Sequence, residues 1–298
     1  MIEITLKLRY NVEKSSERSI FMQYVYLRFP DFRSKALTLS YDDGVKWDRD
    51  LIEIMSKNGL KGTFNINSGL FAKNPGERRL TAEDILSLYE PSGNEVAVHG
   101  VKHLSLTEVN SAIAADDVLQ DRKNLEAMLG HPVRGMAYAN GRFDDAVANI
   151  LAACGIVYSR TTVSTEKFDI PTEWLKMPAT CHHNNPRLMD LLDSFLADNQ
   201  SGYYWSRTPK LFYLWGHSYE FNDNNNWHII EEFAAKAGNR ADVWYATNME
   251  IYNYVKAYDA LIWSVAGDIV QNPTAQHLWL NYQGNEVEVP AGASVKLK

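Results

Sequence analysis

The chain has 298 residues, of which 45% are hydrophobic, so it is long and apolar enough to bury the core of a large α/β domain. Its formal net charge is −7 and no run of lysine or arginine occurs, which argues against nucleic acid or an anionic membrane as partner. No apolar stretch reaches the roughly 18 residues that a spanning helix needs, so we expect no membrane insertion.

The first 34 residues alternate in polarity and carry many charges, and we expect residues 1–34 to be an N-terminal extension that packs on the following domain. They contain no apolar signal-peptide core, which predicts a cytoplasmic protein, or an extracellular or cell-envelope protein if a signal has been removed. Cys154 and Cys181 do not form a C-x-x-C motif, so we expect two buried free thiols. The sequence does not indicate an oligomeric state.

Over residues 35–255, short apolar runs alternate with amphipathic stretches, which is the pattern of βαβ units. The predicted strands are Ala36–Tyr41, Gly62–Asn67, Glu95–Val98, Val133–Tyr138, Gly155–Arg160, Leu211–Trp215 and Asp242–Ala246. Seven strands that alternate with helices predict an α/β fold with a closed or nearly closed barrel.

Several helix ends are marked by residues that satisfy free backbone groups. Capping boxes are predicted at two helix starts, Thr81 with Asp84 and Thr247 with Glu250. A long helix is predicted from Thr107 to Leu129, and it ends at Gly130. Residues 256–298 are predicted to hold the end of the last helix and a β-hairpin that turns at Gly284-Asn285.

Polar residues follow four of the predicted strands. Asp42 and Asp43 end the first strand in "ALTLSYDDGVKWD", His99 and His103 follow the third, and His217 ends the sixth. The sequence "AYANG" ends the fourth strand. In α/β barrels the carboxyl ends of the strands face one mouth, where active sites are built, so we expect these residues to converge.

The pair Asp42 and Asp43 raises a physical question, because two adjacent carboxylates at the end of a buried strand repel each other. Histidines four residues apart, such as His99 and His103, can reach one metal ion, and two histidines with one carboxylate form a common ligand set. A bound cation would therefore offset the repulsion. The adjacent pair His182 and His183 is a weaker candidate, since loops often carry function.

In this order, "TLSYDDG", "HGVKH", "AYANG" and a late strand ending in histidine resemble the NodB-homology polysaccharide deacetylases, carbohydrate esterase family four, over residues 35–255. The resemblance implies a distorted (β/α)7 barrel and a metal-dependent hydrolase that removes acetyl groups from carbohydrates. It implies that Asp42 is the general base and His217 the general acid. It also implies that the metal ligands are the remaining three residues, Asp43, His99 and His103.

The sequence departs from the family pattern at three positions. Gly100 stands where the second motif usually has Ser or Thr, so a loop-stabilising hydrogen bond is missing or replaced. Ala137 stands where the third motif has the arginine that orients the catalytic aspartate. Asn140 replaces an aromatic residue whose backbone N–H is thought to help hold the oxyanion. Three arginines could substitute for the missing one, and spacing does not select among them: Arg134, Arg142 and Arg160.

The sequence therefore predicts an enzyme that deacetylates the N-acetylated sugars of a poly- or oligosaccharide. We expect one divalent ion, with Zn²⁺ favoured and Co²⁺, Ni²⁺ or Fe²⁺ as alternatives, and an acetylated carbohydrate as the partner. Tyr138, Asn140 and Trp215 are candidates for the oxyanion site and substrate walls. Two other hypotheses are an O-acetyl polysaccharide esterase with the same site and a catalytically impaired carbohydrate-binding protein. A Mg²⁺-dependent phosphatase would leave both histidines without a role.

Overall fold

The computed structural model describes residues 24–197 and 208–297, so most of the predicted N-terminal extension lies outside the described residues. A parallel sheet runs in the order β7-β6-β5-β4-β3-β2-β9-β8, and β10 pairs with β2. Its strands are β2 (Lys35–Asp42), β3 (Gly62–Ile66), β4 (Glu95–Val98), β5 (Gly135–Ala137), β6 (Tyr158–Ser164), β7 (Met177–Ala179), β8 (Cys181–His182), β9 (Lys210–Gly216) and β10 (Val243–Tyr245). The predicted α/β fold and all seven predicted strands are confirmed.

Two short strands, β7 and β8, were not predicted, because neither is long enough to show a hydrophobic period. Only Thr180 separates them, and its N–H donates to the carbonyl of Tyr213 in β9 at 2.9 Å. The segment pairs with β6 at one end, where Met177 lies opposite Arg160, and with β9 at the other. Both ends of the strand path therefore lie on one continuous stretch of chain, and the sheet curves back on itself there.

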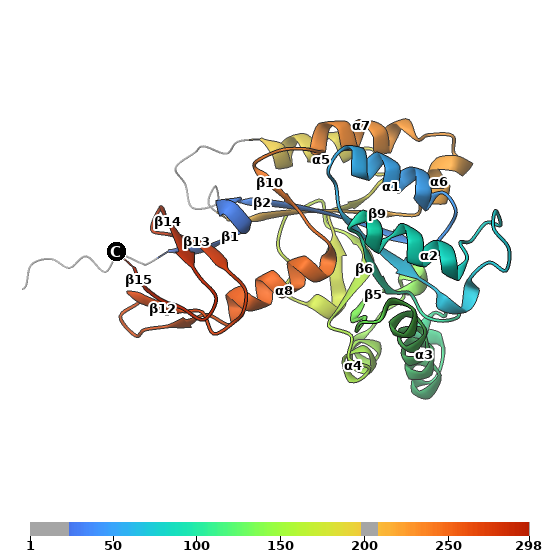
Figure 1. The fold of residues 1–298 in the computed structure, drawn as a ribbon, viewed down its shortest axis with the longest axis horizontal. Coiled ribbons are helices and arrows are strands. Elements are labelled where there is room, and N and C mark those ends of the chain that lie inside the picture. The colour runs from blue at the N-terminus through green and yellow to red at the C-terminus, as the bar shows by residue number, and fades with distance from the viewer. Residues whose placement is uncertain (1–23, 198–207, 298) are drawn as a thin grey trace, which may run out of the picture.

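Helices cover the sheet on both sides (Figure 1). They are α1 (Asp48–Lys57), α2 (Ala82–Leu88), α3 (Ser111–Leu129), α4 (Asp145–Ala153), α5 (Leu188–Leu196), α6 (Ser218–Asp223), α7 (His228–Ala237) and α8 (Asn248–Asp259). In Figure 1, α1, α5 and α7 lie above the sheet, while α3 and α4 lie below it. Because both faces are covered, every residue of β2 is buried, including its polar residues Lys35, Thr38, Ser40 and Asp42.

The helix ends follow the local signals. Both predicted capping boxes form, at Thr81 of α2 and Thr247 of α8. Gly130 ends α3 in the left-handed conformation, as predicted. The predicted start at Thr107 is wrong, because residues Leu106–Glu108 form a separate 3-10 turn and the Asn110 side chain caps α3 instead.

The C-terminal residues, together with a strand near the N-terminus, form two small antiparallel sheets at one end of the molecule (Figure 1). Their strands are β1 (Val25–Arg28), β11 (Ile262–Trp263), β12 (Ile269–Gln271), β13 (Leu278–Tyr282), β14 (Asn285–Val289) and β15 (Ser294–Lys296). The hairpin β13–β14 is present, but its turn is Gln283-Gly284, one residue earlier than predicted, since Tyr282 pairs with Asn285. Both turn residues have positive φ, as a two-residue hairpin turn of this kind requires.

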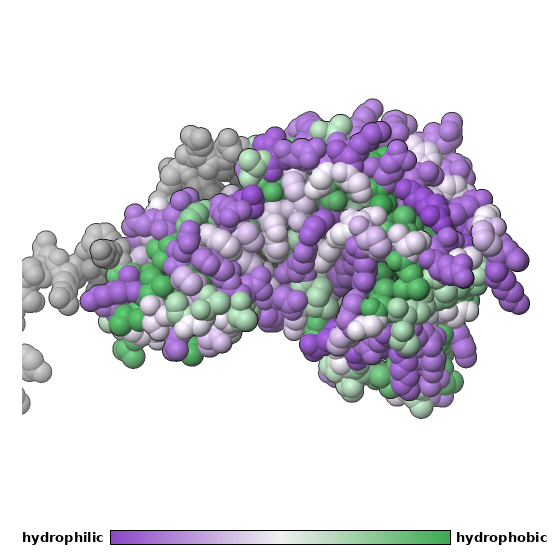
Figure 2. Space-filling view, viewed as in Figure 1, coloured by the Kyte–Doolittle hydropathy of each residue, from purple (hydrophilic) through white to green (hydrophobic). Residues whose placement is uncertain are grey.

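Most of the surface in Figure 2 is hydrophilic, and hydrophobic residues appear among the C-terminal strands. Exposed apolar residues of that region are Ile262, Val265 and Ile269. Within the described residues, no helix combines the length and the apolar character that crossing a membrane demands. Cys154 and Cys181 are both buried free thiols, as predicted.

A buried carboxyl group, that of Asp48, joins three helical segments near the end of β2. It accepts hydrogen bonds from the hydroxyl of Tyr89 at 2.6 Å, from the backbone N–H of Val45 at 3.2 Å and from the hydroxyl of Ser218. Complete burial raises the pKa of Asp48 to about 7, although these hydrogen bonds oppose the shift. Asp48 thereby fixes α1 against the start of α6, which directly follows His217.

We predict that Asp48→Asn reduces the pH dependence of the free energy of unfolding. The pKa of Asp48 is raised in the folded state, so its stabilising contribution is full below about pH 4 and is lost as pH rises towards 7. In this window the free energy of unfolding of the wild type should fall more steeply with rising pH than that of the variant, by up to about 1.4 kcal/mol per pH unit. Urea unfolding between pH 4.5 and 8 measures it. Asp50→Asn, an exposed change in the same helix, is the control, and equal slopes for wild type and Asp48→Asn would contradict the prediction.

Candidate active site

The five predicted polar residues converge at the carboxyl ends of three parallel strands. Asp42 ends β2 and Asp43 follows it, His99 and His103 follow β4, and His217 follows β9. The Nε2 atoms of His99 and His217 lie 3.9 and 3.8 Å from Oδ2 of Asp42. The Nε2 atom of His103 lies 3.7 Å from Oδ1 of Asp43. Sequence reasoning therefore found a set of side chains that the fold brings together.

Asp43, His99 and His103 could hold a metal ion, because one ligand atom from each lies within 4.8 Å of the others. Nδ1 of His99 lies 2.9 Å from the carbonyl of Ala137, which only accepts, so this nitrogen carries the proton. The other ring nitrogen then has a free lone pair, and complete burial lowers the pKa of His99 and favours the neutral ring. This is the arrangement of a metal-ligating histidine, and the residues fit a divalent metal.

The loop that carries His99 is held by two carboxylates of helix α3. Asp121 accepts from the backbone N–H of His99 at 3.0 Å, and Asp117 accepts from that of Lys102 at 3.0 Å. Gly100 has φ +80°, and a Cβ there would lie 2.3 Å from Oδ2 of Asp117. The hydrogen bond expected from Ser or Thr at position 100 is thus replaced by α3, and the close approach of Asp117 requires glycine.

Arg160 on β6 is the arginine that contacts Asp42. It is fully buried, its Nη2 donates to Oδ2 of Asp42, and its guanidinium stacks on the ring of Trp215 at 4.5 Å. The other two candidates lie elsewhere: Arg134 donates to the carbonyl of Gly155, and Arg142 lies 4.0 Å from Glu108. Among the three arginines, the structure selects Arg160.

The charge of Arg160 also sets the protonation of Asp42. Burial alone would raise the pKa of this carboxyl, but the guanidinium and the neighbouring histidines outweigh burial and lower it to about 2. Oδ1 of Asp42 accepts a further hydrogen bond from Nδ2 of Asn65 at 2.8 Å. Asp42 is therefore ionised at neutral pH and fixed at both oxygens.

Glu220 orients His217. Nδ1 of His217 lies 3.0 Å from Oε1 of Glu220, three residues later at the start of α6, so the ring donates to the carboxylate. Burial lowers the pKa of His217, but the hydrogen bond from Glu220 and the charge of Asp42 outweigh it, and the net shift is upward. His217 therefore retains its proton at higher pH than a free histidine.

The neighbouring pair His182 and His183 also faces Glu220. Their Nε2 atoms lie 3.2 and 2.8 Å from Oε2 of Glu220. Although His182, His217 and Glu220 are close enough together to suggest a second metal group, Nδ1 of His182 accepts from the backbone N–H of Asn184. In neutral His182 the proton is then on Nε2, where it can be donated to Glu220 but leaves no lone pair for a metal. We interpret this group as a hydrogen-bond network.

His183 also explains the glycine that precedes His217. Its ring is fully buried and stacks on Phe221 at a centroid distance of 4.1 Å. A Cβ at Gly216 would lie 2.0 Å from Nδ1 of His183, so the ring occupies the space that a side chain would need. The sequence "WGH" at the end of β9 thus reflects packing against the histidine pair.

The three proposed wall residues have different surroundings. Trp215 lies beside the site, with its ring centroid 5.9 Å from that of His217. Asn140 is an exposed residue with φ 57° whose Nδ2 donates to Oγ of Ser105 at 3.1 Å. Tyr138 corrects the prediction, because its side chain is buried in the core and its hydroxyl donates to the carbonyl of Leu175.

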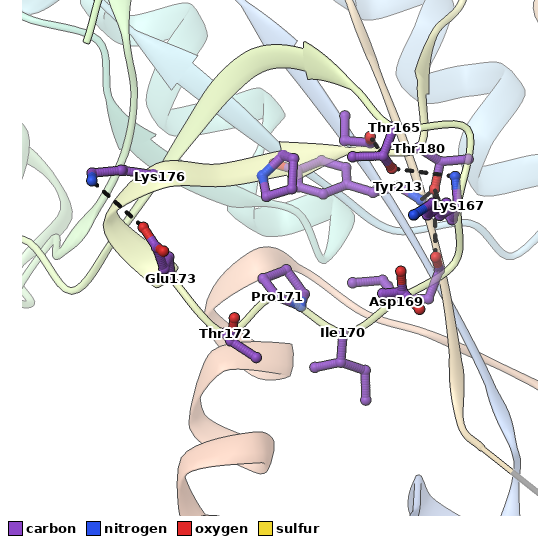
Figure 3. A pocket seen from close by; sticks show the side chains of 13 residues that line it. Thr165, Lys167, Asp169, Ile170, Pro171, Thr172, Glu173, Lys176, Thr180 and Tyr213 are labelled. Carbon is purple, nitrogen blue, oxygen red and sulfur yellow. Dashed lines mark hydrogen bonds and ion pairs between the residues drawn. The ribbon is translucent and has the colours of Figure 1, made fainter. Parts of the chain in front are cut away.

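A cavity of about 300 Å³ lies away from these residues, beside the loop between β6 and β7 (Figure 3). Its lining includes Thr165, Ile170 and Tyr213, and none of the five converging residues. Figure 3 shows Lys176 paired with Glu173 at its edge, at 3.5 Å. The cavity is therefore separate from the candidate active site.

Sequence reasoning missed Glu220 and Arg79, and it left Arg160 unselected. Glu220 had a local signal, since it lies three residues after His217 where a helix begins. Arg79 had none. It follows an irregular loop, and its contact with Asp43 spans 36 positions. Only tertiary structure reveals such a partner.

Several solved structures resemble this chain. The crystal structure of a Mycobacterium smegmatis protein described as a polysaccharide deacetylase aligns at 16% identity over 78% of this chain and 94% of its own, with a TM-score of 0.56. A family 4 carbohydrate esterase from Streptomyces lividans, in complex with acetate, aligns at 15% identity over 71% of this chain and 92% of its own, with a TM-score of 0.45. The first of these similarities supports the fold alone.

A Streptococcus pyogenes deacetylase in complex with acetate aligns at 21% identity over 42% of this chain, with a TM-score of 0.39, and this chain spans only 55% of its length. A search of the curated proteins gives no match. The model of the family described as polysaccharide deacetylase matches residues 30–159, which include the first two motifs. This match confirms the resemblance drawn from the motifs.

Proposed function

We propose that this protein is a metal-dependent hydrolase that removes acetyl groups from the N-acetylated sugars of a poly- or oligosaccharide. The main observation in favour is that Asp42 and His217 lie 3.8 Å apart beside a three-residue ligand set. A proton acceptor and a proton donor thus flank the same small volume as the ligands, which is the arrangement that amide hydrolysis requires.

The metal would be held by Asp43, His99 and His103. Their nitrogen and oxygen donors suit Zn²⁺ best, with Co²⁺, Ni²⁺ or Fe²⁺ as alternatives. When bound, the ion supplies Lewis acidity toward the acetyl carbonyl and the attacking water. Asp43 serves as its anionic ligand, while Asp42 remains available for proton transfer.

Asp42 acts as the general base. It is ionised at neutral pH because its pKa is about 2, and Arg160 together with Asn65 holds the carboxylate in one orientation. A fixed, desolvated carboxylate accepts the proton of the attacking water without reorganising first. Arg160 thus takes the part of the arginine that is missing at Ala137.

His217 acts as the general acid. Its Nε2 faces Asp42 and the reaction volume, while its Nδ1 is bound to Glu220. Glu220 keeps the imidazole protonated by stabilising its positive charge, so the ring can donate a proton to the departing sugar amine. Trp215 lines this side and would exclude water from the reacting groups.

Two other functions use the same residues. An O-acetyl polysaccharide esterase would need the same base, acid and metal, and only the leaving group would differ. Acetate release from chitooligosaccharide and from acetylated xylan separates these two. The hypothesis of an impaired carbohydrate-binding protein rested on the missing arginine, and the buried contact between Arg160 and Asp42 weakens that support.

We predict that Asp42→Asn abolishes acetate release while the protein still binds one equivalent of metal, because the three ligands remain. His103→Gln should lose both acetate release and metal binding, because it removes one of the ligands. Elemental analysis after gel filtration and acetate release on a panel of acetylated glycans measure the two properties. Wild-type protein that binds metal yet releases no acetate from any N- or O-acetylated glycan would contradict the proposed function and favour the binding protein.

We predict that Arg160→Gln lowers the rate at neutral pH by at least about tenfold, since general-base catalysis contributes roughly 10²–10⁴. Loss of the guanidinium leaves burial unopposed, so the pKa of Asp42 rises and the acid limb of the pH–rate profile moves to higher pH. Arg134→Gln, which removes an exposed arginine far from Asp42, is the matched control. A profile for Arg160→Gln that overlaps the wild-type profile would rule out this role.

We predict that Glu220→Gln lowers the pKa of His217 and moves the basic limb of the pH–rate profile to lower pH. The sign follows because the carboxylate stabilises the charged imidazole, and the amide does not. NMR titration of the His217 ring protons measures the pKa directly. Glu166→Gln, which alters a nearby carboxylate bound to Asn185 and Arg187, should leave the titration unchanged. An unchanged His217 pKa in Glu220→Gln would disprove the assignment.

A further inference from the structure

Arg79 contacts the proposed metal ligand Asp43 at two places. Nη2 of Arg79 lies 3.1 Å from Oδ1 of Asp43, and Nη1 donates to the backbone carbonyl of the same residue. The Arg79 side chain is 27% exposed and the Asp43 side chain 13%, so the pair is largely shielded from water. One guanidinium thus fixes both the side chain and the backbone of Asp43.

The backbone of Asp43 needs such support. Its φ is 84°, a left-handed conformation that costs a residue with a side chain free energy and persists only when surrounding contacts impose it. The chain that directly follows Asp43 is paired with the segment that carries Arg79. Val45 and Arg79 form an antiparallel bridge, and the N–H of Leu80 donates to the carbonyl of Gly44 at 2.9 Å. The position of Arg79 beside Asp43 is therefore built into the backbone.

Arg79 also connects Asp43 to the loop that carries the histidine ligands. Its Nη1 donates to Oδ1 of Asn67 at 3.1 Å. Nδ2 of Asn67 in turn donates to the carbonyls of His99 and Gly100, both at 2.8 Å. Asn67 is fully buried. A continuous chain of hydrogen bonds thus runs from the aspartate ligand to the backbone of the first histidine ligand.

We propose that Arg79 is a positioning residue for metal binding, which holds Asp43 in its strained conformation and fixes its distance from His99. This inference rests on the proposed function for the existence of a metal. Arginine suits the task because its planar group offers several N–H donors, and here two nitrogens serve three acceptors. A carboxylate has two oxygens, so an arginine bound to Oδ1 still leaves lone pairs for an ion.

Arg79 could instead weaken metal binding, and the two hypotheses predict changes in affinity of opposite sign. A positive charge next to a ligand repels a divalent cation, so an arginine that did nothing but compete would weaken metal binding. Its removal would then tighten binding. Positioning predicts the reverse sign, since partners of metal ligands typically contribute 10–100-fold in affinity.

The experiment measures Zn²⁺ binding to metal-free full-length protein by calorimetry. Arg79→Gln should raise the dissociation constant 10–100-fold, and Arg79→Lys should also raise it, because one ammonium group cannot reach the carboxylate, the carbonyl and Asn67 together. Arg78→Gln is the matched control. It removes the same charge from the adjacent residue, whose contacts within the described chain are with Trp47, Tyr219 and Asp223. Its dissociation constant should stay within about threefold of wild type.

A second readout follows the site itself. The visible absorption of the Co²⁺-loaded protein should change in Arg79→Gln and not in Arg78→Gln, and thermal melts of the metal-free proteins show which variants are folded. Binding by Arg79→Gln as tight as wild type, or tighter, would overturn the inference while leaving the proposed function intact. Wild-type protein that binds no Zn²⁺ would overturn both.

Discussion

The site depends on the pairing of two adjacent carboxylates with two arginines at the end of a buried strand. Like charges on adjacent residues repel each other, and burial adds the cost of lost hydration. Arg160 on β6 pairs with Asp42, and Arg79 pairs with Asp43. The sequence suggested that a bound cation offsets this repulsion. The protein itself supplies two positive charges, so the aspartates are compatible with folding before any metal binds.

Local patterns predicted most of the fold. The buried run of β2, the capping residues of α2 and α8 and the glycine after α3 act within a few residues, and a single sequence contains that information. The convergence of the five polar residues was also predictable, because parallel strands in a barrel end at one mouth. The short strands β7 and β8 escaped notice because each is stabilised mainly by its neighbours.

The partners of the functional residues were beyond a reading of local patterns. Arg160 lies 118 positions from Asp42 and Arg79 lies 36 from Asp43, and no periodicity links such pairs. Arg160 projects from β6, whereas the missing motif arginine would stand at position 137 on the neighbouring strand β5. The guanidinium that contacts Asp42 thus comes from one strand further along the sheet. Position 137 does lack the arginine, but this departure did not mean that Asp42 lacks a positively charged partner.

The segment from Met177 to His182 contains the strands at both ends of the strand order, β7 and β8. Its first half pairs with the strand that carries Arg160, and its second half pairs with the strand that leads to His217. The strand that carries Arg160 and the strand that leads to His217 are thus linked through five strand residues and Thr180, while β2 and β9, which lead to Asp42 and His217, pair directly with each other. Local opening of the sheet at this segment would separate the strand that carries Arg160, the partner of the proposed base, from the strand that leads to the proposed acid. The geometry of the proposed site and local opening of the fold are in this way coupled through one short stretch of backbone.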